Sequence, residues 1–342
     1  LYISTTAKSG MSQLESTNPV RNHATGVMNR ATHVEVNEDE IADFCEHITE
    51  NYEFETAEWD APVFPTVEEH GVEDATDFLF VGNALNYCFN DMESGEKFTY
   101  KFIGNDWPGS FGMWAGLMDE YQSNPDILDA EHLQSITTED IERIFAPSND
   151  VPLPMPETRA QKLRSVGELM NDYGGSFWNA FNVGMVQLYG ENGVVSNLAS
   201  TEAYRDTRTY NGETVRFDKR AQLTVSMLYG KLLGTEHEFR ISDIEEFTVF
   251  ADYGIPAGLA THNVISYNDE LATRIENREI IEEGSEQEVE IRSATVIAVE
   301  KIQEHLRNNY DVDTSIPVLD YVLWRMRKDA DTNVHLTETT AY

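Results

Sequence analysis

Three charged residues have types and positions that could do chemistry on a small organic substrate, and Asp252 is the first. It lies in the apolar run Phe247–Pro256 (FTVFADYGIP), where we expect the last turn of a helix that begins near Ser242. A carboxylate there faces the negative end of the helix dipole, at a cost of about 0.3–1 kcal/mol. Two interpretations stay open: a surface Asp bonded into the turn before Gly254, or a carboxylate placed to stabilise a developing positive charge.

Lys219 and Asp320 are the other two. Lys219 is one of only eight lysines and follows Phe217 and Asp218, so it is either a salt-bridge partner or an anchor for an anion. Asp320 begins an apolar helical stretch with Tyr321, where it could simply be a cap or a first-turn acid. Two further sets of neighbours have the pattern of structural ion pairs: Arg205 with Asp206, and Glu290 with Arg292.

The charge of the whole chain limits its partners. In 342 residues there are 61 Asp and Glu against 24 Lys and Arg, a formal net charge of −37. Such a surface repels nucleic acid and anionic membranes, so neither is expected as a partner. Acid spread along the whole chain indicates adaptation to a salty cytoplasm, where molar salt shortens the screening length to ~3 Å. We therefore expect a cytoplasmic protein, and the charge describes its environment better than its function.

Motifs for metals and cofactors are missing from the sequence. The nine histidines form no HxxxH or HExxH, and Cys45 and Cys88 form no CxxC, so neither a metal nor a cofactor is expected. The phosphate-loop patterns GxGxxG and GxxxxGK[ST] and the nucleophile pattern GxSxG are also missing. No apolar run reaches 18 residues, so we expect no membrane span.

The elements that must position these residues are mainly helical. Apolar residues at helical spacing predict helices over 39–50, 163–170, 221–232 and 291–306, and a capping box at Ser242 with Glu245 predicts a helix stopped by Gly254 and Pro256. Short strands are predicted at 77–81 and 97–103. The predicted fold class is mainly α with a few short β-strands.

The predicted domain organisation is simple. Residues 1–35 are expected to be a flexible N-terminal segment, with Met11 a candidate initiator and 1–10 not native. Residues 36–342 are expected to form a single domain, with a Pro-rich internal loop at 146–156.

Several sequence blocks, taken together, resemble the queuosine salvage protein family, the queuosine 5′-phosphate N-glycosylases. The order and spacing of these blocks match over roughly 77–325, and the chain is identified as a salt-adapted member. The blocks are FVGNALNYCF at 80–89, GGSFWN at 174–179, Tyr204–Asp206, FDKRAQL at 217–223, DIEEFTVFADYGIP at 243–256, EVEIR at 288–292 and LDYVLW at 319–324.

The resemblance implies a cytosolic, metal-free enzyme with a compact helical fold similar to DNA glycosylases. We expect it to be a monomer, although the sequence does not fix the oligomeric state. It would hydrolyse the N-glycosidic bond of queuosine 5′-phosphate, or of a related 7-deazaguanine nucleotide, and release queuine for tRNA modification. Asp252 would be the catalytic carboxylate, as nucleophile or as activator of water. The residues that would bind substrate are Phe250, Lys219, Asp320 and Tyr321. The residues that would support the site from behind are Arg205, Asp206, Glu290 and Arg292.

The chain departs from the family pattern at four places. Val63 or Phe64 replaces a histidine, Gly254 an arginine, Ile297 an aromatic residue and Arg325 an acid. These changes put the identity of the base in question more than the reaction. Two other functions therefore stay open: a non-catalytic 7-deazapurine or nucleotide-binding protein, and a helical interaction protein with a vestigial pocket.

Overall fold

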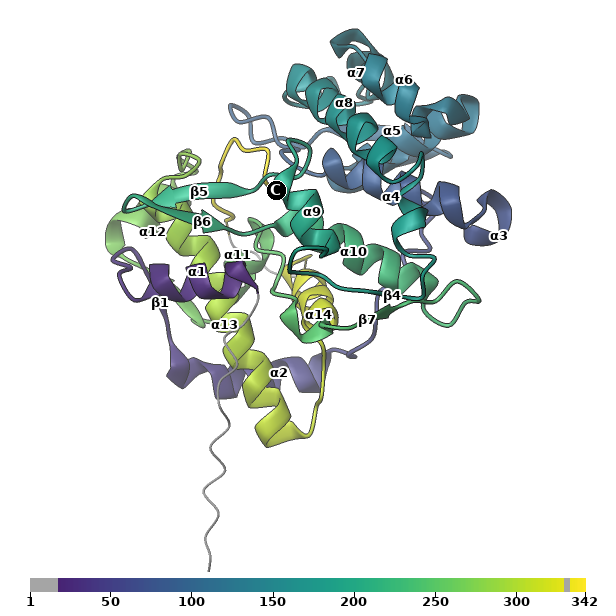
Figure 1. The fold of residues 1–342 in the computed structure, drawn as a ribbon. Helices are drawn as coiled ribbons and strands as arrows, with labels where there is room; N and C mark the ends of the chain where they lie inside the picture. The colour runs from purple at the N-terminus through teal and green to yellow at the C-terminus, as the bar shows by residue number, and fades with distance from the viewer. Residues whose placement is uncertain (1–17, 329–332) are drawn as a thin grey trace, which may run out of the picture.

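Helices dominate the part of the chain that the computed structural model describes, residues 18–328 and 333–342 (Figure 1). Within those residues, helices α1 to α14 span Pro19–Met28, Ile41–Asn51, Val67–His70, Val72–Ala84, Ser110–Ser123, Ala130–Ser135, Thr138–Ile144, Pro156–Asp172, Val194–Ser200, Lys219–Leu232, Gly254–Thr261, Asp269–Glu276, Glu286–Tyr310 and Ile316–Lys328. Single 3₁₀ turns occur at Glu38–Glu40, Pro125–Leu128, Phe177–Ala180 and Ile244–Glu246. The predicted mainly α class is confirmed.

The strands form separate two-stranded pairs. In order, β1 to β8 span Val34–Val36, Thr99–Phe102, Asn105–Pro108, Met185–Val186, Thr207–Tyr210, Glu213–Arg216, Arg240–Ile241 and Ile265–Tyr267. Two pairs are hairpins, β2 with β3 and β5 with β6, while β1 pairs with β8 antiparallel and β4 with β7 parallel. Because each pair is short and isolated, the strands join helices and supply no layer of their own.

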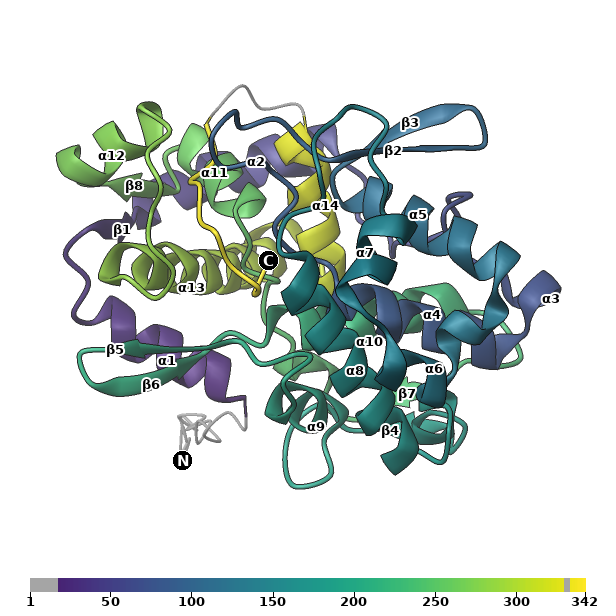
Figure 2. The ribbon, with the colours of Figure 1, turned by 90° about the horizontal axis from the view of Figure 1, so that it is seen from above.

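Helix α13 is the centre of one half of the molecule. Ser285 caps it by accepting the N–H of Glu288, and the periodic apolar face from Ile291 to Leu306 is fully buried, as predicted. Helices α1, α2, α11 and α14 pack against α13. Helices α4 to α8 form the other half, and Figure 2 shows α14 between these two groups.

Most buried apolar residues of both halves form one continuous core that also includes α10. A small second cluster lies apart from it and consists of Val27, Tyr210, Val215, Phe217 and Val289. Helix α10 packs on α4 and α9. Where α4 packs on α5, residue 82 must be glycine, because a Cβ on Gly82 would lie 1.8 Å from the ring of Trp114. The close approach places Trp114 directly against α4, within the half of the molecule formed by α4 to α8.

Several predicted boundaries are confirmed and others are wrong. The predicted helices at 39–50, 163–170 and 221–232 correspond to α2, α8 and α10, and the strand at 97–103 to β2. The strand predicted at 77–81 is wrong: these residues lie in α4, whose side chains are buried on all sides, so that periodicity could not separate helix from strand.

The predicted flexible N-terminal segment is wrong for residues 18–35. They form α1 and β1, and Val20, Ala24 and Val27 of α1 are fully buried, with α1 packed on α13. The remainder of that prediction concerns residues 1–17, which lie outside the described residues. The chain is not helical from 146 to 155, and α8 begins at Pro156. A single domain from residue 36, a monomeric state and similarity to DNA glycosylases stay predictions.

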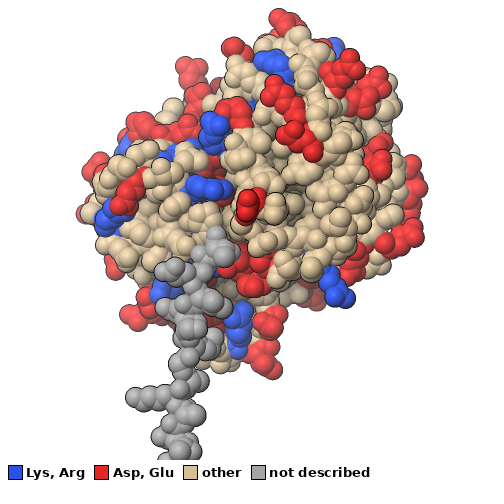
Figure 3. Space-filling model, in the orientation of Figure 1, with Lys and Arg blue, Asp and Glu red and all other residues tan. Residues whose placement is uncertain are grey.

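Acidic side chains are spread over the face of the molecule in Figure 3, and basic side chains are scattered singly among them. None of the helices in the described ranges is both long and apolar enough to cross a membrane.

Candidate active site

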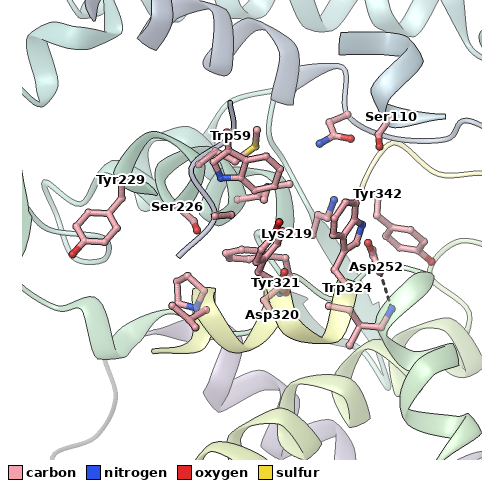
Figure 4. Close-up of a pocket in the computed structure, with 18 of the residues that line it drawn as sticks. Trp59, Ser110, Lys219, Ser226, Tyr229, Asp252, Asp320, Tyr321, Trp324 and Tyr342 are labelled. Atoms are coloured by element: carbon pink, nitrogen blue, oxygen red, sulfur yellow. Dashed lines mark hydrogen bonds between the residues drawn. The ribbon is translucent and has the colours of Figure 1, made fainter. Parts of the chain in front are cut away.

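A pocket lined by aromatic side chains lies between α10, α14, the first turn of α5 and the chain before α11. It holds about 1090 Å³ of empty space, part of it open to solvent. Of the charged side chains in the described residues, only three line it: Lys219, Asp252 and Asp320 (Figure 4). Phe250 and Tyr321 also line it, so the structure brings together all five residues predicted to react with or bind a substrate.

The local structure around Asp252 differs from the prediction in a way that changes its electrostatics. The Ser242–Glu245 capping box is wrong, because the Ser242 hydroxyl donates to the Val186 carbonyl and only a 3₁₀ turn follows. Gly254 and Pro256 do not stop a helix either: they lie in the first turn of α11.

Asp252 therefore precedes the start of a helix instead of ending one. Its Oδ1 accepts the backbone N–H groups of Gly254 at 2.7 Å and Ile255 at 3.1 Å, and one hydrogen bond of Asp252 is drawn in Figure 4. The positive end of the α11 dipole thus stabilises the carboxylate, where we expected a cost. With Oδ1 held by backbone, the carboxylate is fixed at the pocket wall.

Asp320 reaches the pocket from the first turns of α14. Its Oδ1 accepts the backbone N–H of Phe250 at 2.8 Å, which ties α14 to the segment carrying Phe250 and Asp252. Burial raises the pKa of Asp320 to about 7; this hydrogen bond and Lys219 act against that rise, and Asp252 adds to it. Near neutral pH this carboxyl group is divided between its two protonation states.

Lys219 is the first residue of α10 and is 6% exposed. Among the described residues, no carboxylate lies within the 4.0 Å ion-pair distance of its ammonium group, so of the two interpretations of Lys219 the salt bridge is wrong. Burial lowers the pKa of Lys219, and Asp252 and Asp320 partly offset this effect. A buried ammonium without a direct acidic partner, in a chain with so many acids, is a group available to an anionic ligand.

A buried ion pair lies directly behind the pocket. Asp206 and Arg292 are both fully buried and form two hydrogen bonds, at 2.8 and 2.7 Å. Burial opposes ionisation of Asp206, but the guanidinium of Arg292 outweighs it and lowers the pKa to about 2. Asp206 also accepts the N–H of Lys219 at 3.1 Å, and Arg292 donates to the Ala251 carbonyl at 3.1 Å. The pair thereby connects the backbone of Lys219 to the residue before Asp252.

The other two residues predicted to support the site lie away from it. Glu290 accepts the backbone N–H groups of residues 32–34, at 2.7 to 3.2 Å, and so holds β1 against α13. Arg205 is exposed and pairs with Glu202 at 3.1 Å on the surface. Neither residue lines the pocket.

Several aromatic residues of the pocket were missed, among them Trp324, Tyr342 and Trp59. Trp324 stacks on Tyr321, with ring centroids 5.9 Å apart, and its position one turn after Asp320 in LDYVLW was a usable signal. Tyr342 lines the pocket, donates to Glu288 at 3.2 Å and lies under the guanidinium of Arg292. Trp59 also lines the pocket. No periodicity marks Tyr342 or Trp59, because each follows a segment without regular structure.

The four departures from the family pattern have different positions. Phe64 packs on Trp59 and Trp114, at 5.9 and 5.1 Å between ring centroids, and Arg325 lies over the ring of Tyr321. Gly254 supplies a backbone N–H to Asp252. Ile297 lines a different hollow, near α1 and β1. Only Phe64, Arg325 and Gly254 therefore touch residues of the pocket.

Over residues 18–328 and 333–342, no group of three or more His, Cys, Asp or Glu side chains is arranged to hold a metal ion. Cys45 and Cys88 are both buried free thiols.

A mainly helical fold around an aromatic pocket with two carboxylates and one ammonium group is the arrangement of a small-molecule site. The family model for queuosine salvage proteins matches residues 65–342. The chain belongs to this family.

Curated relatives are similar over most of the chain. It is 33% identical over 256 residues to the queuosine 5′-phosphate N-glycosylase/hydrolase of Sphaerobacter thermophilus, covering 74% of this chain and 76% of that protein. The proteins of the same name from Mus musculus and Dictyostelium discoideum are 29% and 30% identical, over 265 and 249 residues. These alignments cover 74% and 72% of this chain, and 76% and 71% of the respective relatives.

Proposed function

We propose that this protein hydrolyses the N-glycosidic bond of queuosine 5′-phosphate, or of a closely related 7-deazaguanine nucleotide, and releases the free base. The family and the names of the relatives support this activity. The observation that carries it is Asp252, a carboxylate fixed by two backbone N–H groups in the same pocket as Lys219 and Asp320.

Cleavage of an N-glycosidic bond builds positive charge on the sugar. A carboxylate already held in place stabilises that charge without having to reorganise, which is the main source of its effect on the rate. Asp252 can act by this route, by accepting a proton from the attacking water, or as a nucleophile. A 7-deazapurine has no N7 to protonate, so stabilisation of the sugar cation matters more here than for an ordinary purine.

The remaining residues suit recognition of the base and the phosphate. An ionised Asp320 accepts from two adjacent N–H donors of a guanine-like edge. Phe250 and Tyr321 offer ring faces for stacking, which is worth about 1–3 kcal/mol per base in nucleic-acid complexes. Lys219 is the one cation among the described pocket residues and is assigned to the 5′-phosphate.

The test is base release from queuosine 5′-monophosphate in molar KCl by wild type and Asp252→Asn. Asn keeps the shape and removes the charge, so we expect turnover to fall by about 10²-fold or more, on the scale of losing one preorganised group. Asp172→Asn removes the same charge from an exposed site on α8 and should keep full activity.

The result that contradicts the proposal is equally clear. If wild type binds the nucleotide but releases no base from any 7-deazaguanine monophosphate, the protein is a binding protein. The replacement of a family histidine and acid by Phe64 and Arg325, both beside the pocket, is the observation that favours this second function.

A further inference from the structure

One wall of the pocket comes from a segment that precedes the residues matched by the family model. Residues 52–60, here called the strap, join α2 to the turn before α3 and have no regular secondary structure. Their side chains alternate: Tyr52, Phe54 and Thr56 are half-buried, whereas Glu53 and Glu55 are exposed. The strap is therefore an extended chain with an apolar inner face and an acidic outer face.

The inner face of the strap supplies the pocket with Thr56, Ala57 and Trp59. The indole of Trp59 lies 6.1 Å from the ring of Tyr321 and 5.9 Å from that of Phe64, between centroids. Figure 4 shows it facing the α14 residues Asp320 and Tyr321. Trp59 thus borders the end of the pocket assigned to the base.

The outer face of the strap borders a second hollow, lined by residues 55–60 with Gly230, Leu233 and Tyr321. Thr56, Ala57, Trp59 and Tyr321 line both spaces. The strap, together with Tyr321 of α14, therefore forms a thin wall between the pocket and this hollow. A ligand that contacts the wall must contact these few residues.

The strap is held at defined points. The Lys231 ammonium donates to the Trp59 carbonyl at 3.2 Å and lies 3.9 Å from Asp60, with its side chain 3% exposed. Beside it, a Cβ on Gly230 would lie 2.2 Å from the Ala57 carbonyl, so glycine permits the close approach. Trp59 has a φ of 56°, a strained conformation for an aromatic residue, which its surroundings must maintain.

The second charged contact of the strap is weaker. Glu55 pairs with Arg325 at 3.3 Å, with side chains 59% and 36% exposed. Exposed pairs contribute little and are screened by salt. Lys231 is therefore the anchor that fixes the position of Trp59.

We propose that Trp59 is a specificity-determining residue that contacts the heteroaromatic base of the substrate, and that Lys231 is the residue that positions it. This inference rests on the proposed function, since it assigns a further contact in the same site. Trp59 covers the base while Lys219 holds the phosphate, so the two residues govern different parts of one ligand. Loss of Trp59 must then weaken the free base and the nucleotide alike.

The experiment compares wild type with Trp59→Ala, Trp59→Phe and, as control, Trp178→Ala, which removes an indole outside the pocket that packs on His237. KM and kcat are measured with queuosine 5′-monophosphate, and binding of free queuine is measured by calorimetry. Trp59→Ala should raise KM and the Kd for queuine by about tenfold or more, on the scale of a lost stacking contact, with kcat changed less. Trp59→Phe should recover most of the loss.

The positioning role of Lys231 has its own readout. Lys231→Met should shift KM and the queuine Kd in the same direction as Trp59→Ala, and Lys231→Arg should restore them. A purely structural role would lower the melting temperature of Lys231→Met and leave KM unchanged.

The outcomes separate this inference from the proposed function. Turnover by wild type, with Trp59→Ala within twofold of it in KM and queuine binding, overturns the inference and leaves the activity standing. An equal loss in Trp178→Ala overturns it too. If wild type binds queuine but does not turn over the nucleotide, the proposed reaction is wrong. The role of Trp59 is then still tested by comparing the Kd for queuine of wild type and Trp59→Ala. A wild type that binds neither molecule overturns both.

Discussion

The pocket and the layer behind it both hold buried charges, but the charges are arranged in opposite ways. Behind the pocket, Asp206 and Arg292 neutralise each other through two hydrogen bonds, and both are fully buried. In the pocket, no ion pair within 4.0 Å is recorded in the described residues for Lys219, Asp252 or Asp320. The two sets are connected, because Asp206 accepts the N–H of Lys219.

The difference shows which buried charges serve the fold and which serve a ligand. In an ion pair, the attraction between the partners offsets the free energy needed to remove both charges from water. When one partner is removed, the other remains buried without this compensation. A buried charge that borders a cavity without an ion-pair partner keeps part of this cost, and a ligand of opposite charge can offset it. Burial alone therefore does not distinguish structure from function here, whereas pairing does.

The largest expected effect on stability is in the paired layer. Among the described residues, Asp206→Asn leaves the buried Arg292 with Glu288 alone, at 3.5 Å, as a charged partner. Breaking a buried pair typically costs about 3–5 kcal/mol, so the free energy of unfolding should fall by an amount in this range. Urea unfolding at constant KCl measures it. A loss below about 1 kcal/mol, the scale of an exposed pair, would show that the Asp206–Arg292 pair contributes little to the stability of the fold.

Lys219→Met is the matching test in the pocket, because it removes a buried charge that has no ion-pair partner among the described residues. Its free energy of unfolding should stay equal to wild type or rise, since an unpaired buried ammonium is lost. Its KM for the nucleotide should rise by about 10- to 100-fold, the scale of one charge-assisted hydrogen bond. The dephosphorylated nucleoside should bind as well as to wild type. Equal weakening of nucleoside and nucleotide would instead assign Lys219 to the sugar or to Asp252.

The periodic parts of the sequence were predictable and the site's local geometry was less so. The apolar spacing of α13 and α10 determines their buried faces, so these helices were predicted correctly. The motif residues Phe250, Asp252 and Tyr321 were placed in the pocket by resemblance, and they do line it. The strand predicted at 77–81 failed because α4 is buried all round and carries no amphipathic signal.

What the sequence could not provide are contacts between distant segments. Asp252 looked like the end of a helix because Ser242 and Glu245 have the pattern of a capping box, but tertiary contacts of Ser242 override that local signal. Trp59 and Tyr342 reach the pocket only because irregular segments fold back over it. No local sequence pattern predicts that these segments fold back over the pocket.

Asp320 should make substrate binding depend on pH. Burial raises its pKa to about 7, and the guanine-like edge donates hydrogen bonds, so the ionised form is the one that binds. KM should therefore fall by about tenfold from pH 6 to pH 8, as the ionised fraction rises. Asp320→Asn should remove this dependence. A KM that is flat in wild type, or that rises with pH, would contradict the assignment of Asp320 to those donors.

The same group has a consequence for stability with a definite sign. Its pKa is higher in the folded protein than in the unfolded chain, so the folded state binds more protons between about pH 4 and pH 7. The stability that Asp320 contributes is complete below this range and is lost as the pH rises through about 7. Asp320→Asn should thus flatten the decrease of the unfolding free energy over this window, measured by urea unfolding at pH 5 and pH 8.

The smallest effect is expected at Arg205, which resemblance grouped with Asp206 as a residue supporting the site. Within the described part of the chain its one ion pair is with Glu202, both side chains are more than half exposed, and molar salt screens such a pair. Arg205→Ala should therefore change the unfolding free energy by less than about 0.5 kcal/mol and leave kcat and KM unchanged. A loss of activity comparable to that of Lys219→Met would mean that Arg205 reaches the ligand, and pairing would then fail as the criterion that separates structural from functional charge.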